Sequence, residues 1–391
     1  MKYLTRTIWI LSVVSLLNDI SSEILYPVMP LFLSSIGFSS VLIGVLEGFA
    51  EATAGLSKGY FGRWSDSMGR RLPFVNIGYL LSAFSKPMMA AFTHPLWIFS
   101  ARATDRLGKG IRTAARDAIL SDESTPENKG KVFGFHKGMD TLGATIGPLL
   151  ALVFLYYYPA QYTWIFMIAF VPALLGTLLT LFVKEKKLPR NEKPSFQLSQ
   201  TFDYLTTAPA DYKKIVGALL LFALFNSSDL FLLMKIKESG LSDYHVIGCY
   251  ILYNLVFALA AFPLGHLADK FGMKKTMLFG LVFFVLVYAG FGINHSLTGF
   301  VILFVLYGIY AASTDGISKA LISNMVPKTE TASAIGTFSG LNSIAVLLAS
   351  TLAGVIWKFV SPDAVFLISA AGALAAAVYL YNIRVKESIK S

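Results

Sequence analysis

Charged residues are scarce in this sequence, and cysteine is nearly absent. Charged residues make up 14% of the 391 positions and apolar residues 55%, and the mean hydropathy is +0.62. Soluble globular domains carry about 25% charged residues, so the composition excludes a soluble globule and indicates a polytopic membrane protein. The single cysteine, Cys249, excludes an intrachain disulfide.

The sequence patterns of common enzyme classes are missing as well. There is no Gly-x-Ser-x-Gly and no paired His-Glu metal motif, and Gly108-Lys-Gly110 lacks the spacing of a phosphate loop. An intramembrane enzyme or a lipid-handling scaffold is therefore a weaker alternative to a transporter. A divalent-metal transporter is also disfavoured, because Arg and Lys side chains beside the intramembrane carboxylates would repel the ion. We predict no metal site and no cofactor.

Lys and Arg residues gather in alternate loops of the chain. The formal net charge is +10, which in a soluble protein would suggest nucleic-acid binding. Here the positive-inside bias places both termini and the loops around Asp66 and Asp269 in the cytoplasm. We therefore expect a multi-pass protein of a bacterial inner membrane, in contact with lipids and without a nucleic-acid partner. Long loops suited to partner proteins are absent, so a monomer is the default expectation.

Apolar segments long enough to cross a bilayer recur along the chain, since about 20 residues suffice for one crossing. The twelve predicted spans are 7–35, 39–62, 72–93, 95–119, 130–157, 161–183, 213–236, 242–266, 275–293, 297–324, 330–358 and 362–383. A Lys-rich segment separates the first six from the last six. The predicted organisation is an N-terminal bundle (1–183), a cytoplasmic linker (184–212) and a C-terminal bundle (213–391).

One loop pattern occurs twice, about half the chain apart. Gly62-Arg-Trp-Ser-Asp66-Ser-Met-Gly69-Arg70-Arg71 is repeated as Gly265-His-Leu-Ala-Asp269-Lys-Phe-Gly272, about 203 positions later. Glycine permits tight turns, and the aspartate can cap a neighbouring helix N-terminus. Arg70 and Arg71 are expected to hold their loop to anionic lipid headgroups. A duplicated membrane bundle is typical of secondary transporters, in which two halves rock about a site at the bilayer midplane.

The repeated loop resembles the signature between helices two and three of the major facilitator superfamily, and the resemblance covers the whole chain. It implies an all-α membrane fold of twelve helices in two pseudo-symmetric six-helix bundles. Gly143-Ala-Thr-Ile-Gly147-Pro148 is similar to the helix-five pattern of the proton-coupled drug and organic-solute exporters of that superfamily. Arg106-x-x-x-Gly110 is similar to the helix-four pattern, in which the Arg serves proton coupling. Departures are Ser67, where many members carry a basic residue, and Ala151, where the exporter pattern ends in glycine. The gating residues that the resemblance implies are Gly62, Asp66, Gly69, Arg70, Arg71, Gly143, Gly147, Pro148, Gly265, Asp269 and Gly272.

The fourth predicted span carries a stripe of charge. Steps of three and four residues place six charged residues on one helix face, namely Arg102, Asp105, Arg106, Lys109, Arg112 and Arg116. A cation near the bilayer centre costs at least about 2.5 kcal/mol on insertion scales, so the stripe must face water or carboxylates. Asp19 and Glu23, one turn apart in the first span, are such carboxylates. Two acids on one helix face repel as anions, so one of them is expected to hold a proton.

Polar residues of other spans complete the predicted site. The second half repeats the placement of the first, with Asn226 and Asp229 in the seventh span and Asp315 in the tenth. The predicted substrate-binding residues are Asn18, Asp19, Glu23, Arg102, Arg106, Lys109, Asn226, Asp229 and Asp315. The predicted proton-coupling residues are Asp19, Glu23, Arg106, His136 and Asp140. Glu47 and Lys86 lie at similar depth in neighbouring spans and are predicted to form a structural ion pair.

These observations predict a proton-coupled secondary active transporter that moves a small anionic or amphipathic organic solute by alternating access. The resemblance to exporters favours export by proton antiport, with the proton gradient as the energy source. Two readings of the acids stay open, because Asp19 and Glu23 can exchange protons or simply neutralise the basic stripe. The alternative in direction is uptake, by proton symport, of an anionic nutrient or a siderophore-like metal chelate.

Overall fold

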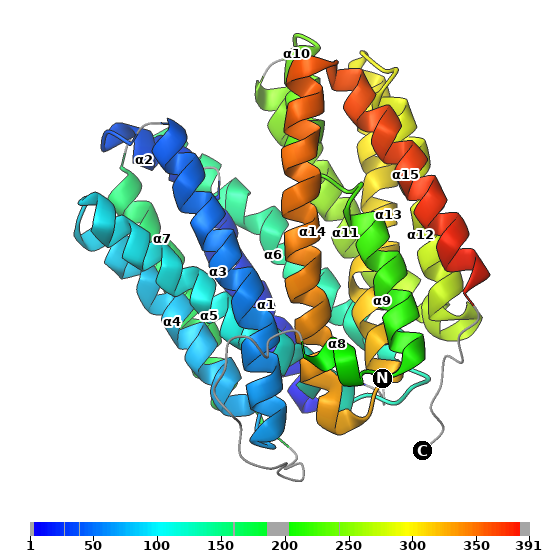
Figure 1. Ribbon diagram of the computed structural model, residues 1–391. Coiled ribbons are helices and arrows are strands. Elements are labelled where there is room, and N and C mark those ends of the chain that lie inside the picture. Colours follow the sequence, from blue (N-terminus) through cyan, green and yellow to red (C-terminus); the bar gives the residue numbers. More distant parts are fainter. Residues whose placement is uncertain are drawn as a thin grey trace. The chain divides into compact units, whose positions relative to one another are not determined.

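The described chain is helical from end to end (Figure 1). The computed structural model describes residues 4–26, 28–38, 40–158, 161–185, 203–241 and 243–383. The helices are α1 (Arg6–Leu25), α2 (Met29–Ser35), α3 (Ser40–Ser67), α4 (Leu72–Ala91), α5 (Pro95–Asp122), α6 (Lys129–Tyr157), α7 (Tyr162–Thr180), α8 (Tyr204–Thr207), α9 (Ala210–Ala223), α10 (Leu230–Glu238), α11 (Asp243–Phe271), α12 (Met273–Phe291), α13 (Leu297–Asn324), α14 (Thr331–Phe359) and α15 (Pro362–Asn382). Within the described ranges no strand occurs.

The long helices follow the predicted spans closely. Eight of the described helical segments are long and apolar enough, by length and composition, to cross a membrane. α5 is not among them, because its charged stripe lowers its hydropathy, although its 28 residues are ample for a crossing. Most of the predicted linker 184–212 lies outside the described residues, so the predicted domain bounds stay a prediction.

Two predicted spans are interrupted. The first, 7–35, divides into α1 and α2, and Pro30 lies in the first turn of α2, where its missing N–H costs no helical hydrogen bond. The seventh, 213–236, is non-helical between Ala223 and Leu230. Residues 226–229 read Asn-Ser-Ser-Asp, and such side chains compete for backbone groups and disfavour helix interiors. The Ser228 N–H donates instead to the Ser350 hydroxyl at 3.0 Å.

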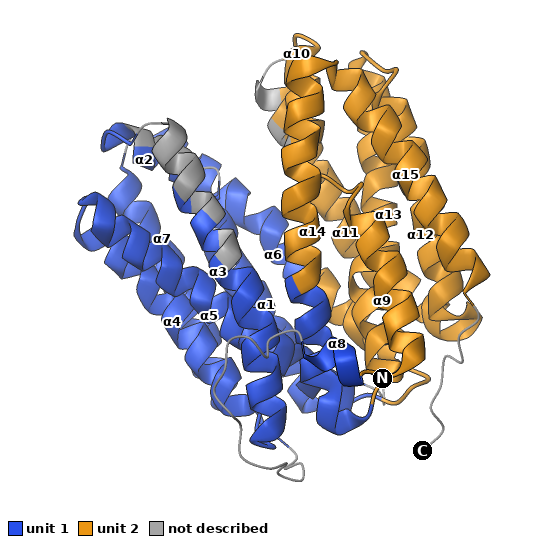
Figure 2. Cartoon of the chain, viewed as in Figure 1, with its two compact units in different colours: residues 1–124, 139–207, 327–340 blue, residues 125–138, 208–326, 341–391 orange. Residues whose placement is uncertain are grey.

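By their internal contacts the helices form two compact units, coloured separately in Figure 2. Unit 1 comprises Met1–Ser124, Met139–Thr207 and Pro327–Gly340, and unit 2 comprises Thr125–Gly138, Ala208–Val326 and Leu341–Ser391. The first turns of α6 therefore belong to unit 2, and the first turns of α14 belong to unit 1.

The same packing order occurs inside each unit. In unit 1, α5 packs against α3 and α4, and α1 packs against α7. In unit 2, α13 packs against α11 and α12, and α9 packs against α15. These are the equivalent helices of the two sequence repeats, so the duplication seen in the loops extends to the packing of the helices.

At two glycines of the repeated loop the backbone adopts a conformation that favours glycine. Gly69 has φ +62° and Gly272 has φ +100°, a region that residues with a side chain rarely adopt. Gly69 ends the turn that leads from α3 toward α4, and Gly272 lies between α11 and α12. The sequence repeat at these positions thus reflects the same backbone geometry in both units.

Candidate functional site

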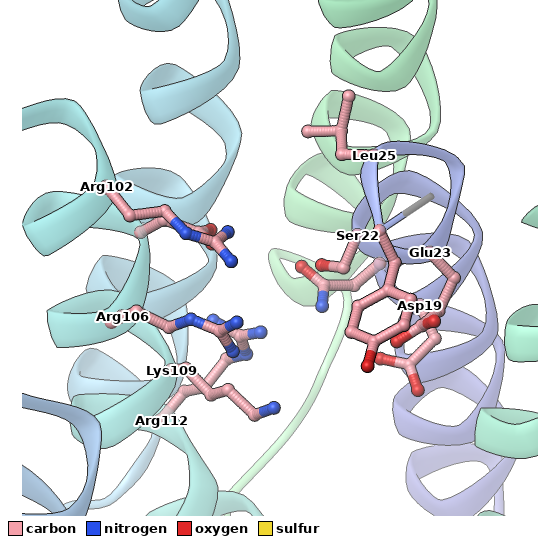
Figure 3. A pocket seen from close by; sticks show the side chains of 11 residues that line it. Asp19, Ser22, Glu23, Leu25, Arg102, Arg106, Lys109 and Arg112 are labelled. Carbon is pink, nitrogen blue, oxygen red and sulfur yellow. The ribbon is translucent and has the colours of Figure 1, made fainter. Parts of the chain in front are cut away.

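A charged cavity lies between α1 and α5 within unit 1 (Figure 3). Its empty space is about 540 Å³, open solvent at its mouth included. In Figure 3 the cationic side chains of α5 extend toward Asp19 and Glu23 of α1. The lining residues are Asn18, Asp19, Ser22, Glu23, Leu25, Tyr26, Arg102, Asp105, Arg106, Lys109 and Arg112.

All six substrate-binding residues predicted for the first half meet in this cavity. Sequence reasoning did not assign Ser22, Tyr26, Asp105 or Arg112 to the site, although the structure places them in its lining. The signal for three of them was present, because Ser22 lies between the predicted acids and Asp105 and Arg112 belong to the α5 stripe. Nothing in the sequence distinguished Tyr26 from the other aromatic residues.

Asp105 is held by cations on two helices. The Lys86 side chain on α4 is 1% exposed, and its ammonium donates to Asp105 Oδ1 at 2.6 Å. Arg102 lies 3.6 Å from the other carboxylate oxygen, one turn earlier on α5. The side chain of Glu47 lies outside the described residues, so the predicted Glu47–Lys86 pair stays a prediction. Asp105 is the ion-pair partner that the structure gives to Lys86.

The cavity has an excess of positive charge. Its lining carries four cations and three carboxylates, and Lys86 neutralises Asp105 from outside the lining. The four lining cations therefore face only two further carboxylates, Asp19 and Glu23. A cleft lined by one sign of charge concentrates ligands of the opposite sign, so this cavity favours an anion.

Arg112 is fixed against α4 at one end of the stripe. Its Nη1 donates to the Ser82 hydroxyl at 2.5 Å and to the Gly78 carbonyl at 3.4 Å. Its guanidinium carbon lies 4.6 Å from the centroid of the Tyr79 ring, which is within cation–π distance. These contacts hold the Arg112 side chain against α4. The predicted binding role therefore stays with Arg102, Arg106 and Lys109.

Arg116 links three helices of unit 1 outside the cavity lining. Its Nε and Nη2 donate to Asp117 Oδ1 at 2.9 and 2.8 Å, and its Nη1 donates to the Ser15 hydroxyl at 3.2 Å. Ser15 in turn donates to Asp140 Oδ1 at 2.6 Å. Asp140, predicted as a proton-coupling residue, is therefore tied to α1 through Ser15.

The glycines of α6 bring α1 close to that helix. A Cβ at Gly147 would meet the Ile24 nitrogen at 2.8 Å and the Glu23 carbonyl carbon at 2.9 Å. A Cβ at Gly143 would meet the Leu16 carbonyl oxygen at 2.5 Å and Asp19 Cβ at 3.0 Å. Since α1 provides one wall of the cavity, these two glycines set the position of its carboxylates.

In unit 1 the last turn of α3 caps the first turn of α14. Asp66 Oδ2 accepts the Ser333 N–H at 2.7 Å and the Ser333 hydroxyl at 2.9 Å. Asp66 Oδ1 accepts Arg71 Nε at 3.0 Å and Nη2 at 2.7 Å, and Arg71 also donates to Asp122 and to the Lys328 carbonyl. A carboxylate at a helix N-terminus accepts hydrogen bonds from the free N–H groups and interacts favourably with the positive end of the helix dipole. The capping role predicted for Asp66 is confirmed.

In unit 2 the equivalent aspartate caps α6. Asp269 Oδ1 accepts the Gly130 N–H at 2.7 Å, and Oδ2 accepts the Lys131 N–H at 2.9 Å. Gly265 lies against the Gly130 backbone so closely that a Cβ would overlap the carbonyl oxygen. Both repeated loops thus perform the same task, each within its own unit.

The lipid role expected of Arg71 is wrong, because this side chain is fully buried. Its Asp66 and Asp122 partners satisfy the charge inside the protein, and its backbone N–H donates to Glu185. Arg70 is exposed, and its lipid contact stays a prediction.

The remaining predicted residues lie in unit 2. Asp229 accepts the Tyr307 hydroxyl at 2.7 Å, and the Asn226 amide donates to the Tyr310 hydroxyl at 3.2 Å. Asp315 pairs with Lys137 at 2.9 Å. His136 is buried in the part of α6 that belongs to unit 2. None of these residues is part of the cavity lining in unit 1.

Comparison with known sequences identifies the family. The Major Facilitator Superfamily pattern matches residues 11–252 and 242–391. An uncharacterised transporter of this type from Methanocaldococcus jannaschii is 34% identical over 372 residues, which cover 94% of this chain and 92% of the relative. The chain belongs to the Major Facilitator Superfamily. The predicted family and fold class are confirmed.

More distant relatives of this superfamily include a multi-drug resistance efflux pump PmrA homolog from Lactococcus lactis. It is 22% identical over 317 residues, which cover 79% of this chain and 77% of the relative. The crystal structure of the human organic anion transporter MFSD10 superposes with a TM-score of 0.78 at 16% identity, covering 96% of this chain and 99% of that one. At this identity the likeness shows the fold. The chain is thus a multi-pass membrane transporter of the Major Facilitator Superfamily, and its relatives are transporters rather than enzymes.

Proposed function

We propose that this transporter carries a small anionic organic solute, which binds in the cavity between α1 and α5. The observation that carries the proposal is the excess of cations in the lining, with Asp105 already neutralised by Lys86. Arg102, Arg106 and Lys109 would bind the carboxylate or phosphate of the solute. Guanidinium groups suit this task because they offer paired N–H donors in a planar arrangement.

Transport against a gradient requires an energy source, and we propose the proton gradient. Acidic side chains at membrane depth are costly and typically serve ion or proton pathways. Asp19 and Glu23 are the sequence-based candidates for proton exchange. Protonation of such a group would weaken its attraction to the α5 cations and bias the two states of an alternating-access cycle.

We propose export, by proton antiport, to the outside of an inner membrane. The support is the exporter-like pattern at Gly143, Gly147 and Pro148 together with the similarity to an efflux pump. The gating role of Asp66 and Asp269, which the family resemblance implies, is part of this proposal. Uptake of an anionic nutrient or chelate by proton symport uses the same cavity and differs only in direction.

The proposal is tested by the thermal unfolding of the purified protein in the presence of defined solutes. Salicylate, citrate and glycerol 3-phosphate represent small organic anions, and tetraphenylphosphonium represents an organic cation. At least one anion should raise the midpoint temperature of the wild-type protein, because a ligand that binds only the native state stabilises it. Arg106→Gln should lose this stabilisation, while Arg63→Gln, an exposed cation outside the cavity, should keep it. Stabilisation by the cation alone would refute an anion site.

A further inference from the structure

The break in the seventh span places a second group of polar side chains, at residues 226–229, in unit 2. α9 ends at Ala223 and α10 begins at Leu230, and Asp229 lies at the end of the unwound segment between them. Discontinuous helices in transporters place backbone groups and half-helix ends at substrate and ion sites. Unwound backbone at membrane depth is tolerated only where protein groups or water form hydrogen bonds with its N–H and C=O groups. The break therefore marks residues 226–229 as a candidate ion or substrate site.

Hydroxyl groups rather than cations surround the Asp229 carboxylate. Tyr307 on α13 donates to Asp229 Oδ1 at 2.7 Å, and the Tyr253 hydroxyl on α11 also hydrogen-bonds to Asp229. The rings of Tyr253 and Tyr307 lie 5.0 Å apart, and those of Tyr307 and Tyr310 lie 5.2 Å apart. The Asn226 Oδ1 atom is buried nearby and accepts no hydrogen bond from the described residues.

Two cations of unit 2, Lys235 and Lys137, are bound to other acids. Lys235 of α10 lies 2.5 Å from Asp363 of α15 and 3.9 Å from Glu238. Lys137 of α6 pairs with Asp315 of α13. Among the described residues Asp229 forms no ion pair. The other titratable groups of this cluster are Tyr250 and Tyr253 of α11, Tyr288 of α12, and Tyr307, Tyr310 and Asp315 of α13, and α14 contributes the neutral Ser350.

Such surroundings make the charge of Asp229 easy to change. An unpaired carboxylate removed from water is costly, and a neutral hydrogen bond to a charged group returns only about 1.5–3 kcal/mol. The protonated carboxyl can keep its contact with the tyrosine hydroxyls, because a phenol both donates and accepts. In contrast, Asp19 and Glu23 face the α5 cations across the unit 1 cavity.

We propose that Asp229, held by Tyr307 and Tyr253, is the proton-binding group that couples this transporter to the proton gradient. This inference rests on the proposed proton-coupled transport and replaces Asp19 and Glu23 as the proton carriers. The carboxylate takes one proton from water on the side where the gradient supplies it, and it releases the same proton to water on the other side. Tyr307 and Tyr253 donate to the anion and accept from the acid, so the aromatic cluster serves both forms.

The direct test does not need a transported solute. Infrared difference spectra of the purified protein are recorded between acid and alkaline pH, and the C=O stretch of a protonated carboxyl group is followed. The wild-type protein should show such a band at acid pH, and Asp229→Asn should lose it. Asp211→Asn, which removes an exposed acid from the first turn of α9, should keep it. Asp19→Asn and Glu23→Gln should keep it as well.

A second variant keeps the proposal testable if Asp229→Asn does not fold. Tyr307→Phe removes one hydrogen bond from the carboxyl, so the band should shift in frequency. The pH at which it is half-formed should rise, because the anion loses a donor. An unchanged band in both Asp229→Asn and Tyr307→Phe would overturn the proposal, as would its loss in Glu23→Gln alone.

A transport measurement separates this inference from the proposed function. Asp229 is not part of the cavity lining in unit 1, and proton binding replaces its predicted substrate-binding role. For the panel anion that the wild-type protein moves in liposomes, Asp229→Asn should therefore retain exchange of labelled for unlabelled anion. It should lose accumulation driven by a pH gradient, to the level reached without the gradient. Gradient-driven accumulation that survives in Asp229→Asn would overturn the proton assignment. If the wild-type protein moves none of the anions, the proposed substrate class fails, while the infrared test still decides the role of Asp229.

Discussion

Single residues decide the charge of the cavity, and the pair of Asp105 with Lys86 is the clearest case. Lys86 is fully buried, and its ammonium lies 2.6 Å from Asp105. Without that pair the carboxylate of Asp105 would offset one of the lining cations, and the buried ammonium would have no counter-charge. The pair thus has a structural role and an indirect role in anion selectivity.

We expect Asp105→Asn to destabilise the protein by about 3–5 kcal/mol, because it leaves the charge of Lys86 buried without a partner. The double variant Asp105→Asn with Lys86→Met should recover much of this loss, since both charges are then absent. Thermal unfolding in detergent measures both. A single variant as stable as the wild type would show that Lys86 has another adequate partner.

The sequence predicted the members of the cavity better than their pairing. Helical spacing was sufficient to place Arg102, Arg106 and Lys109 on one face. The free-energy cost of an unpaired cation in the bilayer was sufficient to predict acids opposite them. The partner of Lys86 could not be found in this way, because the choice of partner depends on which helix packs beside α4. That choice is a tertiary contact with no periodic signal in the chain.

At the scale of helices, close packing between α6 and α1 positions the acidic wall of the cavity. Gly147 touches the α1 backbone at Glu23 and Ile24. An added methyl group there would have to displace α1, because the atoms that it meets are mainly backbone and cannot rotate away.

We expect Gly147→Ala to cost about 1–3 kcal/mol of stability through overpacking and to weaken anion binding by moving Glu23. Gly217→Ala is the matched control, because a Cβ at this α9 position meets nothing within 4 Å. Alanine is also the better helix former, so this control should be neutral or stabilising. Anion titrations followed by thermal unfolding report both effects. Equal behaviour of the two variants would refute the positioning role of Gly147.

Helix bounds were predictable from hydropathy, whereas the break at residues 226–229 was not. Span length and charge are properties that a sequence window averages, so α4, α12 and α15 begin and end within a few residues of their predicted limits. The break depends on local competition between polar side chains and the backbone, which a window of apolar residues conceals. Asn226 and Asp229 were predicted as site residues, but their surroundings of tyrosine hydroxyls became visible only in the structure.

At the scale of the whole molecule, the two units share one order of helix packing but carry different polar side chains. Each has an aspartate that caps a helix: Asp66 caps the N-terminus of α14, and Asp269 caps the N-terminus of α6. Unit 1 carries the cationic cavity, and unit 2 carries the aromatic cluster around Asp229. Such a division suits coupled transport, in which the solute and the proton bind to different groups and a shared conformational change links them.

The measurement that tests this account most directly is the internal pH of liposomes that contain the purified protein. Salicylate, citrate, glycerol 3-phosphate and tetraphenylphosphonium are added in turn under a preset pH gradient. We predict that at least one anion evokes a proton flux in the wild-type protein and that Arg106→Gln abolishes it. A flux evoked only by tetraphenylphosphonium, or an anion-evoked flux that persists in Arg106→Gln, would contradict it.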